Sequence, residues 1–142
     1  KENNMSAATN ALEISLLDHL VGNATYTPGT LYLALATAVA DPEAGTFTEV
    51  TNTGTAYTRQ SLAASNWAGA ASGSVTTDTN VSFTTATADY GTVTHIVVVG
   101  GSGADTQGGG VPLITQALTS SKTVETGDTF VVNAGNLTVN LT

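Results

Sequence analysis

The chain has no cysteine and very little positive charge. Its 142 residues include 3 Lys and Arg against 11 Asp and Glu, which gives a formal net charge of −8. The absence of cysteine excludes disulfides, thiolate catalysis and cysteine-based zinc sites. A surface that follows a phosphate backbone needs several Lys or Arg side chains, so these counts predict no binding to nucleic acid.

Charged residues and long hydrophobic runs are also scarce. Only 10% of the residues are charged while 41% are hydrophobic, the reverse of the balance found in disordered chains. The longest apolar runs, such as residues 96–99, fall far short of the roughly 18 residues that a membrane helix needs. The first residues lack the basic-then-apolar pattern of a signal peptide. We therefore expect no membrane partner and a chain of one domain's size.

One segment near the N-terminus has a helical period. Leu12, Leu16 and Leu20 follow one another at steps of four residues, with Leu17 and Val21 beside them, which places them on one face of a helix. The pattern predicts a helix over residues 7–21 with this face buried. Residues 1–5 are polar and are expected to form a flexible N-terminal arm.

The rest of the chain favours strands. It is rich in threonine, with 27 in all, and its apolar residues recur every second position. Strands are expected at 31–36, 47–50, 57–62, 81–83, 93–99, 129–132 and 137–141. Residues 93–99 are apolar on both faces and so predict a central strand. The last two segments predict a hairpin with a four-residue loop.

These elements predict a mainly β fold, an antiparallel β-sandwich or jelly-roll-like barrel with one N-terminal α-helix. The expected domain organisation is the arm at 1–5 followed by a single β-sandwich domain at 6–142. The segment 100–110, which holds six of the chain's fifteen glycines, is interpreted as a mobile connection.

Residues that carry chemistry are few. The two histidines, His19 and His95, lie on different predicted elements, and His95 is expected to share a strand face with Val93, Val97 and Val99 as a structural residue. The string 100–104 has Ala104 where a nucleophile elbow needs glycine. We predict no enzyme activity, no catalytic residues, no metal site and no cofactor.

An aromatic platform for sugars is a further hypothesis. Trp67 and Tyr90, with the loop 100–110, are the candidate glycan contacts, although a core position is favoured for Trp67. Such a site would make the chain a host-receptor module that binds glycans.

Low charge on a β-prone surface favours burial by neighbours. Few lysines are available to protect the strand edges, so we expect a homo-oligomer, a trimer by analogy with spikes and decoration proteins. The candidate contacts between subunits are Lys1, Glu2, Asn3, Asn4, Gly101, Gly103 and Gly109.

The order of short motifs resembles a family of small virion proteins from tailed bacteriophages, often labelled tail fibre proteins. The likeness covers about residues 6–141. Its motifs are the helix at 10–20, Tyr-Thr-Pro-Gly-Thr-Leu-Tyr-Leu-Ala-Leu at 26–35, Tyr-Thr-Arg-Gln at 57–60, Val-Ser-Phe at 81–83, Ala-Thr-Ala-Asp-Tyr-Gly-Thr-Val-Thr-His at 86–95, Leu-Thr-Ser-Ser-Lys-Thr-Val at 118–124, Gly-Asp at 127–128 and Ala-Gly-Asn-Leu-Thr-Val at 134–139.

The resemblance implies a structural component of the phage particle in which these motifs are framework. The expected function is oligomeric packing, as a capsid cement or decoration protein or as a tail-associated subunit. Its partners would be itself and other virion proteins, such as the major capsid or tail proteins. It would be made in the bacterial cytoplasm and reside in the virion.

Overall fold

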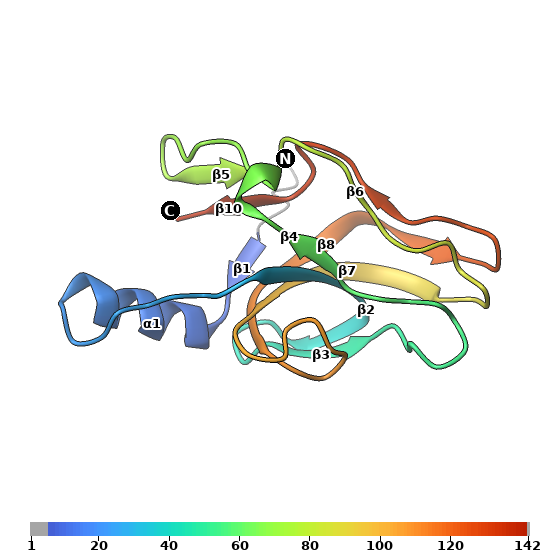
Figure 1. Ribbon diagram of the computed structural model, residues 1–142, viewed down its shortest axis with the longest axis horizontal. Helices are drawn as coiled ribbons and strands as arrows, with labels where there is room; N and C mark the ends of the chain where they lie inside the picture. Colours follow the sequence, from blue (N-terminus) through green and yellow to red (C-terminus); the bar gives the residue numbers. More distant parts are fainter. Residues whose placement is uncertain (1–5, 142) are drawn as a thin grey trace.

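The computed structural model describes residues 6–141, which form two β layers and one helix (Figure 1). The larger layer is an antiparallel sheet of six strands. Its order is β1 (Ser6–Ala8), β8 (Val111–Val124), β7 (Gly91–Gly100), β2 (Leu31–Asp41) and β3 (Thr46–Glu49), with β4 (Gln60–Leu62) also paired to β2. As predicted, the chain is mainly β and antiparallel, with one helix near the N-terminus.

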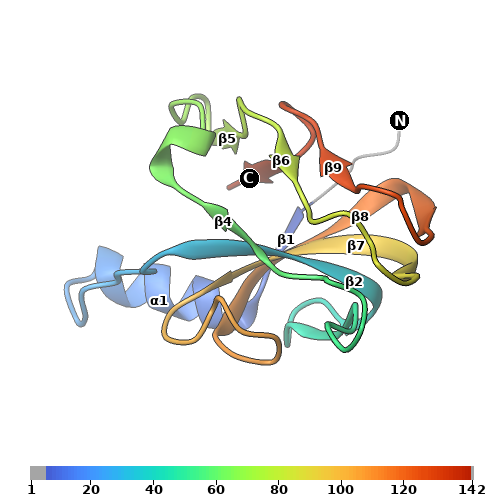
Figure 2. The same ribbon diagram turned by 45° about the vertical axis from the view of Figure 1, so that its right-hand side comes forward.

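The second layer consists of two short strand pairs that lie over one face of the large sheet (Figure 2). The pairs are β5 (Ser74–Thr76) with β10 (Thr138–Asn140), and β6 (Val81–Ser82) with β9 (Val131–Val132); a 3₁₀ turn, η1 (Ala64–Asn66), precedes β5. The predicted hairpin between 129–132 and 137–141 is therefore wrong. Both segments contain strands, but each pairs with a segment before β7 because the local pattern fixes a strand without fixing its partner.

Strand β7 is central, as its apolar sequence predicts. It pairs with β2 on one side and with β8 on the other. Leu33 and Leu35 of β2 point into the core between the two layers, and Ala34 and Ala36 point to the opposite face. There a smaller cluster forms with Ala104 of the loop that joins β7 to β8. The large sheet is thus covered on both faces.

His95 lies beside a bulge that the sequence did not predict. The pairing of β7 with β8 jumps from Val93 opposite Lys122 to His95 opposite Ala117. Val93 consequently faces the core between the layers, while Val97 and Val99 face the smaller cluster. The expectation that Val93, Val97 and Val99 share one face is wrong, because a bulge reverses the alternation.

Protonation of His95 should destabilise the fold. Burial lowers the pKa of His95 from its usual 6.5, so its stabilising contribution is present above pH 6.5 and is lost as the pH falls below that value. We expect the free energy of unfolding to fall less between about pH 7.5 and about pH 5 in His95→Gln than in the parent. Denaturant titration at both pH values measures this difference, with His19→Gln as control. Identical pH profiles for the parent and His95→Gln would contradict the burial argument.

The helix α1 (Asn10–Leu20) is shorter than predicted because residues 6–8 form β1. Its N-terminus is fixed to the large sheet by Thr9, whose backbone N–H donates to the Leu113 carbonyl at 2.9 Å and whose hydroxyl donates to the Pro112 carbonyl at 2.8 Å. The same hydroxyl oxygen accepts the Leu12 N–H and caps the helix. From this anchor the helix projects away from the sheets (Figure 1).

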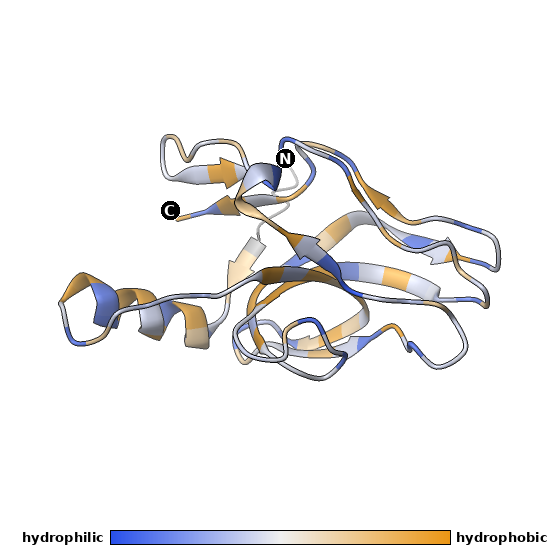
Figure 3. Cartoon of the chain, in the orientation of Figure 1, coloured by the Kyte–Doolittle hydropathy of each residue, from blue (hydrophilic) through white to orange (hydrophobic). Residues whose placement is uncertain are grey.

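Only part of the predicted apolar face of α1 is buried. Leu12 is buried and Leu16 packs partly against the core, but Leu20 is 78% exposed. Leu20 lies at the end that projects away from the sheets, where no described residue covers it. Figure 3 shows that apolar residues nevertheless continue along the projecting helix.

Candidate functional site: a groove beside strand β8

A buried arginine organises the loop 101–110. The guanidinium of Arg59 forms a bidentate ion pair with Glu49, with N–O distances of 2.7 Å for both contacts. Its Nη1 also donates to the carbonyls of Ala104 and Gly109, at 2.8 and 2.9 Å. The glycine content of this loop predicts a mobile connection, but the structure contains intrachain bonds that the composition does not reveal.

Tyr57 completes this buried polar cluster. Its hydroxyl donates to the Glu49 carboxylate at 2.8 Å and accepts the backbone N–H of Leu35 at 2.9 Å. Burial, followed by the negative charge of Glu49, raises the pKa of Tyr57 well above its usual 10.0. The phenol therefore stays neutral and links β2, β3 and the segment before β4.

Removing the Tyr57 hydroxyl should destabilise the fold. Tyr57→Phe leaves the buried Leu35 N–H without an acceptor and is expected to cost about 1–3 kcal/mol at neutral pH. Because the folded-state pKa is raised, the hydroxyl's pH-dependent contribution is present below pH 10 and lost above it, and Tyr57→Phe should flatten that alkaline decrease. Denaturant titration measures both effects.

Tyr26→Phe is the matched control, because the Tyr26 hydroxyl is buried without a hydrogen-bond partner within residues 6–141. A loss of stability at neutral pH as large in Tyr26→Phe as in Tyr57→Phe would show that the hydrogen bonds of Tyr57 do not cause the effect.

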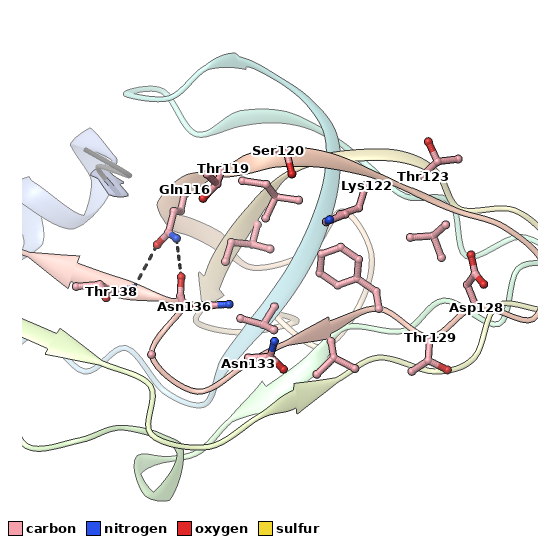
Figure 4. Close-up of a pocket in the computed structure, with 17 residues that line it drawn as sticks. Gln116, Thr119, Ser120, Lys122, Thr123, Asp128, Thr129, Asn133, Asn136 and Thr138 are labelled. Atoms are coloured by element: carbon pink, nitrogen blue, oxygen red, sulfur yellow. Dashed lines mark hydrogen bonds between the residues drawn. The ribbon is translucent and has the colours of Figure 1, made fainter. Parts of the chain in front are cut away.

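A groove opens where β8 leaves the regular ladder. Between the pairs Val93 with Lys122 and His95 with Ala117, β8 has four residues opposite one residue of β7. On its other edge, β8 pairs with β1 from Ile114 to Gln116 and no further among the described residues. Residues 118–121 therefore leave the ladder, pairing with β7 resumes at Lys122, and the second half of β8 faces the segment 128–138 across a cavity of about 610 Å³ (Figure 4).

The groove has an apolar floor and a polar rim. The floor contains the side chains Ile96, Leu118, Val124, Phe130 and Val132. The rim carries hydroxyl and amide groups, and its polar residues are Gln116, Thr119, Ser120, Lys122, Thr123, Asp128, Thr129, Asn133, Asn136 and Thr138. An apolar floor with a polar rim is the usual anatomy of a surface that binds another macromolecule.

Hydrogen bonds fix both ends of the groove. At one end the Gln116 side chain donates to the Asn136 carbonyl at 2.8 Å and accepts the Thr138 N–H at 3.3 Å (Figure 4). At the other end the Asp128 carboxylate accepts the Glu125 N–H at 3.0 Å. These contacts make the groove a preformed feature of the fold.

The groove carries the free cation of the described chain. Residues 6–141 contain two basic side chains, Arg59 and Lys122. Arg59 is occupied by Glu49, whereas Lys122 is exposed and forms no ion pair with any described residue. Its side chain lies over the groove in Figure 4. In a chain of net charge −8, Lys122 therefore gives this rim a local positive charge.

The predicted glycan contacts do not form one site. Tyr90 is 4% exposed, and its hydroxyl donates to the Thr84 carbonyl, so its ring is not available for stacking on a sugar. Trp67 is half-buried and packs against the core between the layers. The loop 101–110 covers the opposite face of the large sheet.

The predicted contacts between subunits are only partly described. Gly101 and Gly103 are exposed, and Gly109 is half-buried with its carbonyl bound to Arg59. Lys1, Glu2, Asn3 and Asn4, in the predicted arm 1–5, lie outside the described residues. Whether the three glycines contact another subunit stays a prediction.

The part of the chain that the structure describes contains no group of three or more His, Asp or Glu residues placed to hold a metal ion. Within the same residues, no helix is long and apolar enough to cross a membrane.

A protein-family model described as Podophage GP4 fiber I protein gp80 matches residues 7–140. The chain belongs to this family. The match confirms the resemblance to phage fibre proteins and identifies a structural protein of tailed phages and a virion component. A search of curated proteins found no match.

Sequence reasoning missed the groove and the whole of β8, since none of the predicted strands covers residues 111–124. The segment 117–123 is polar and lacks the two-residue apolar period, so it gave no strand signal. Arg59 was a usable signal, because it lies two residues after Tyr57 on the same face of the predicted strand 57–62, and a buried arginine is seldom without a partner.

Proposed function

We propose that the chain is a non-enzymatic structural subunit of a phage fibre or its attachment site, and that it works by packing against copies of itself and other virion proteins. The observation that supports this proposal is a second apolar stripe on α1. Ile14, Leu17 and Val21 are 60%, 60% and 67% exposed, although α1 already has a buried face. A helix with apolar residues on two sides favours a neighbour on both.

A fibre role is favoured over a capsid cement or decoration role by the family's description. The number of copies per particle separates these alternatives. A fibre component should be present as a small multiple of the tail symmetry, whereas a head-shell component should be present in hundreds of copies. Quantitative mass spectrometry of purified particles measures this number.

The host-receptor hypothesis receives less support. Its candidate residues, Trp67, Tyr90 and the loop 100–110, lie on different parts of the fold, as described above. Binding of the isolated chain to a glycan array, retained when the surface of α1 is altered, would favour that hypothesis over packing.

Changing one residue of the exposed stripe tests the packing proposal. Leu17→Asp introduces a charge at an exposed helix position, so the chain should fold normally but lose its place in assembled particles. We expect at least about tenfold fewer copies per particle, because a buried leucine contributes roughly 1.5–3 kcal/mol to a contact.

The control is Val111→Asp, which makes a similar change at an exposed valine of β8 outside the stripe. Equal incorporation of both variants at the parental level would contradict the proposal.

A further inference from the structure

The exposed stripe of α1 is opposite the face that packs on the chain's own core. At 3.6 residues per turn, Ile14, Leu17 and Val21 lie within about 60° of one another, and Leu12 and Leu16 point roughly the other way. The spacing i, i+3, i+7 is the anchor pattern of a helix that lies in an apolar groove.

Carboxylates flank this stripe on both sides. Glu13 and Asp18 lie about 70° from its centre in opposite directions. The helix has no Lys or Arg, and its one histidine, His19, points toward the buried side, where Nδ1 accepts the Tyr26 N–H at 3.3 Å. Packing this stripe against the same stripe of another copy would bring carboxylates together, which disfavours a helix–helix contact between copies.

The groove beside β8 offers the complementary surface. Its floor is apolar, and its rim carries Lys122. Its volume of about 610 Å³ is some four times the roughly 150 Å³ that holds one benzene ring, so it has room for several aliphatic side chains. The one carboxylate in its lining, Asp128, already accepts a backbone hydrogen bond at the end of the groove.

The two surfaces are too far apart to meet within one chain. The helix is anchored at Pro112 and Leu113, near the start of β8, and projects outward from there (Figure 1). Pro112 pairs with Val99 of β7 and Lys122 with Val93, so the anchor and Lys122 are six β7 residues apart, or roughly 20 Å at the rise of a strand. The helix itself is only about 16 Å long.

We propose that α1 of one copy docks its Ile14, Leu17 and Val21 stripe into the β8 groove of a second copy, with Lys122 facing the carboxylate of Asp18. The contact joins different surfaces of the two copies, so repetition closes a ring or extends a fibre. This proposed contact rests on the packing role under Proposed function and identifies α1 and the β8 groove as the two surfaces in contact.

Cysteine cross-linking tests this pairing directly, since the chain has no cysteine of its own. Leu17→Cys and Val131→Cys each replace an exposed apolar residue, one on the stripe and one on the groove lining. Mixed under mild oxidation, these two variants should form a disulfide-linked heterodimer in at least about tenfold excess over Leu17→Cys mixed with Val111→Cys. Equal yields with Val131→Cys and Val111→Cys, or a Leu17–Leu17 product as the main species, would overturn the proposal.

A mixing experiment checks that the contact is between unlike surfaces. Leu17→Asp and Val131→Asp should each lower self-association at least about tenfold, as measured by sedimentation velocity. Mixed, they should form dimers that neither forms alone, because the intact helix of one fits the intact groove of the other. Failure of the mixture to form dimers would overturn the head-to-tail arrangement.

Charge reversal tests the electrostatic part. Lys122→Glu should weaken association, and Asp18→Lys in the partner copy should restore part of the loss. If Asp18→Lys does not restore association with the Lys122→Glu variant, Lys122 does not take part in the contact.

These results are separable from those on the proposed function. A chain that enters particles but shows neither cross-link nor self-association would keep the virion role and refute the helix-in-groove contact. A chain that self-associates in this way but is absent from particles would keep the helix-in-groove contact and refute the virion role.

Discussion

Arg59→Ala is expected to lower the free energy of unfolding by about 3–5 kcal/mol, because it leaves the Glu49 carboxylate buried without its cation. The side chains of Arg59 and Glu49 are 2% and 7% exposed, so solvent cannot replace the lost partner. The same change frees the carbonyls of Ala104 and Gly109. A loss of this size is a large share of the roughly 5–15 kcal/mol that stabilises a typical domain.

Denaturant titration of the purified chain measures this loss. Arg59→Met combined with Glu49→Gln is the control, since removing both charges should cost less than removing the cation alone. A loss below about 1 kcal/mol in Arg59→Ala would show that the ion pair does not hold the loop.

Gly110→Ala is expected to lower the free energy of unfolding by about 3 kcal/mol, through backbone strain and a steric clash together. Gly110 has a φ of +71°, and a Cβ there would lie 2.7 Å from the Cα of Ala104 and 2.9 Å from the carbonyl oxygen of Gly100. Neither backbone atom can move without displacing the loop that Arg59 holds.

The matched control is two residues away. Gly108 has a φ of +77°, but a Cβ added there would meet no atom within 4 Å, so Gly108→Ala should lose only about 1–2 kcal/mol from backbone strain. Thermal and denaturant unfolding of both variants give the comparison. Equal losses would mean that close packing of the loop contributes nothing.

The sequence predicted the strand content well where residues alternate between two environments. Strand β7 is predicted to be central because residues 93–99 are apolar on both faces, and it pairs on both sides. Strand partners were harder to predict. The segments around Val131 and Val139 have similar local patterns, yet each pairs with a different earlier strand, since pairing depends on contacts far apart in sequence.

The helix illustrates a second limit. Leucines at steps of four predict one buried face, and Leu12 is indeed buried. The prediction that Leu17 and Val21 lie beside this buried face is wrong, because together with Ile14 they form an exposed stripe on the other side of the helix. Its exposure follows from the way the helix projects from the sheets, which no local pattern encodes.

The candidate site was the least predictable part. Its walls are brought together by the bulge in β8 and by the bonds of Gln116 to the segment 136–138. No sequence period marks a bulge of this kind, and the hydroxyl-rich residues 117–123 resemble a loop. The glycine-rich segment 100–110 gave a different error. Its composition predicts a mobile connection, but Arg59 binds the carbonyls of Ala104 and Gly109.

The most direct test of packing through the α1 stripe is the labelling rate of Leu17→Cys by a maleimide, measured by mass spectrometry of this chain in dilute solution and in intact particles. We predict fast labelling of the isolated chain and strong protection in the particle, at least about tenfold, with Thr53→Cys on an exposed loop labelled at a similar rate in both. Equally fast labelling of Leu17→Cys in solution and in the particle would contradict the account.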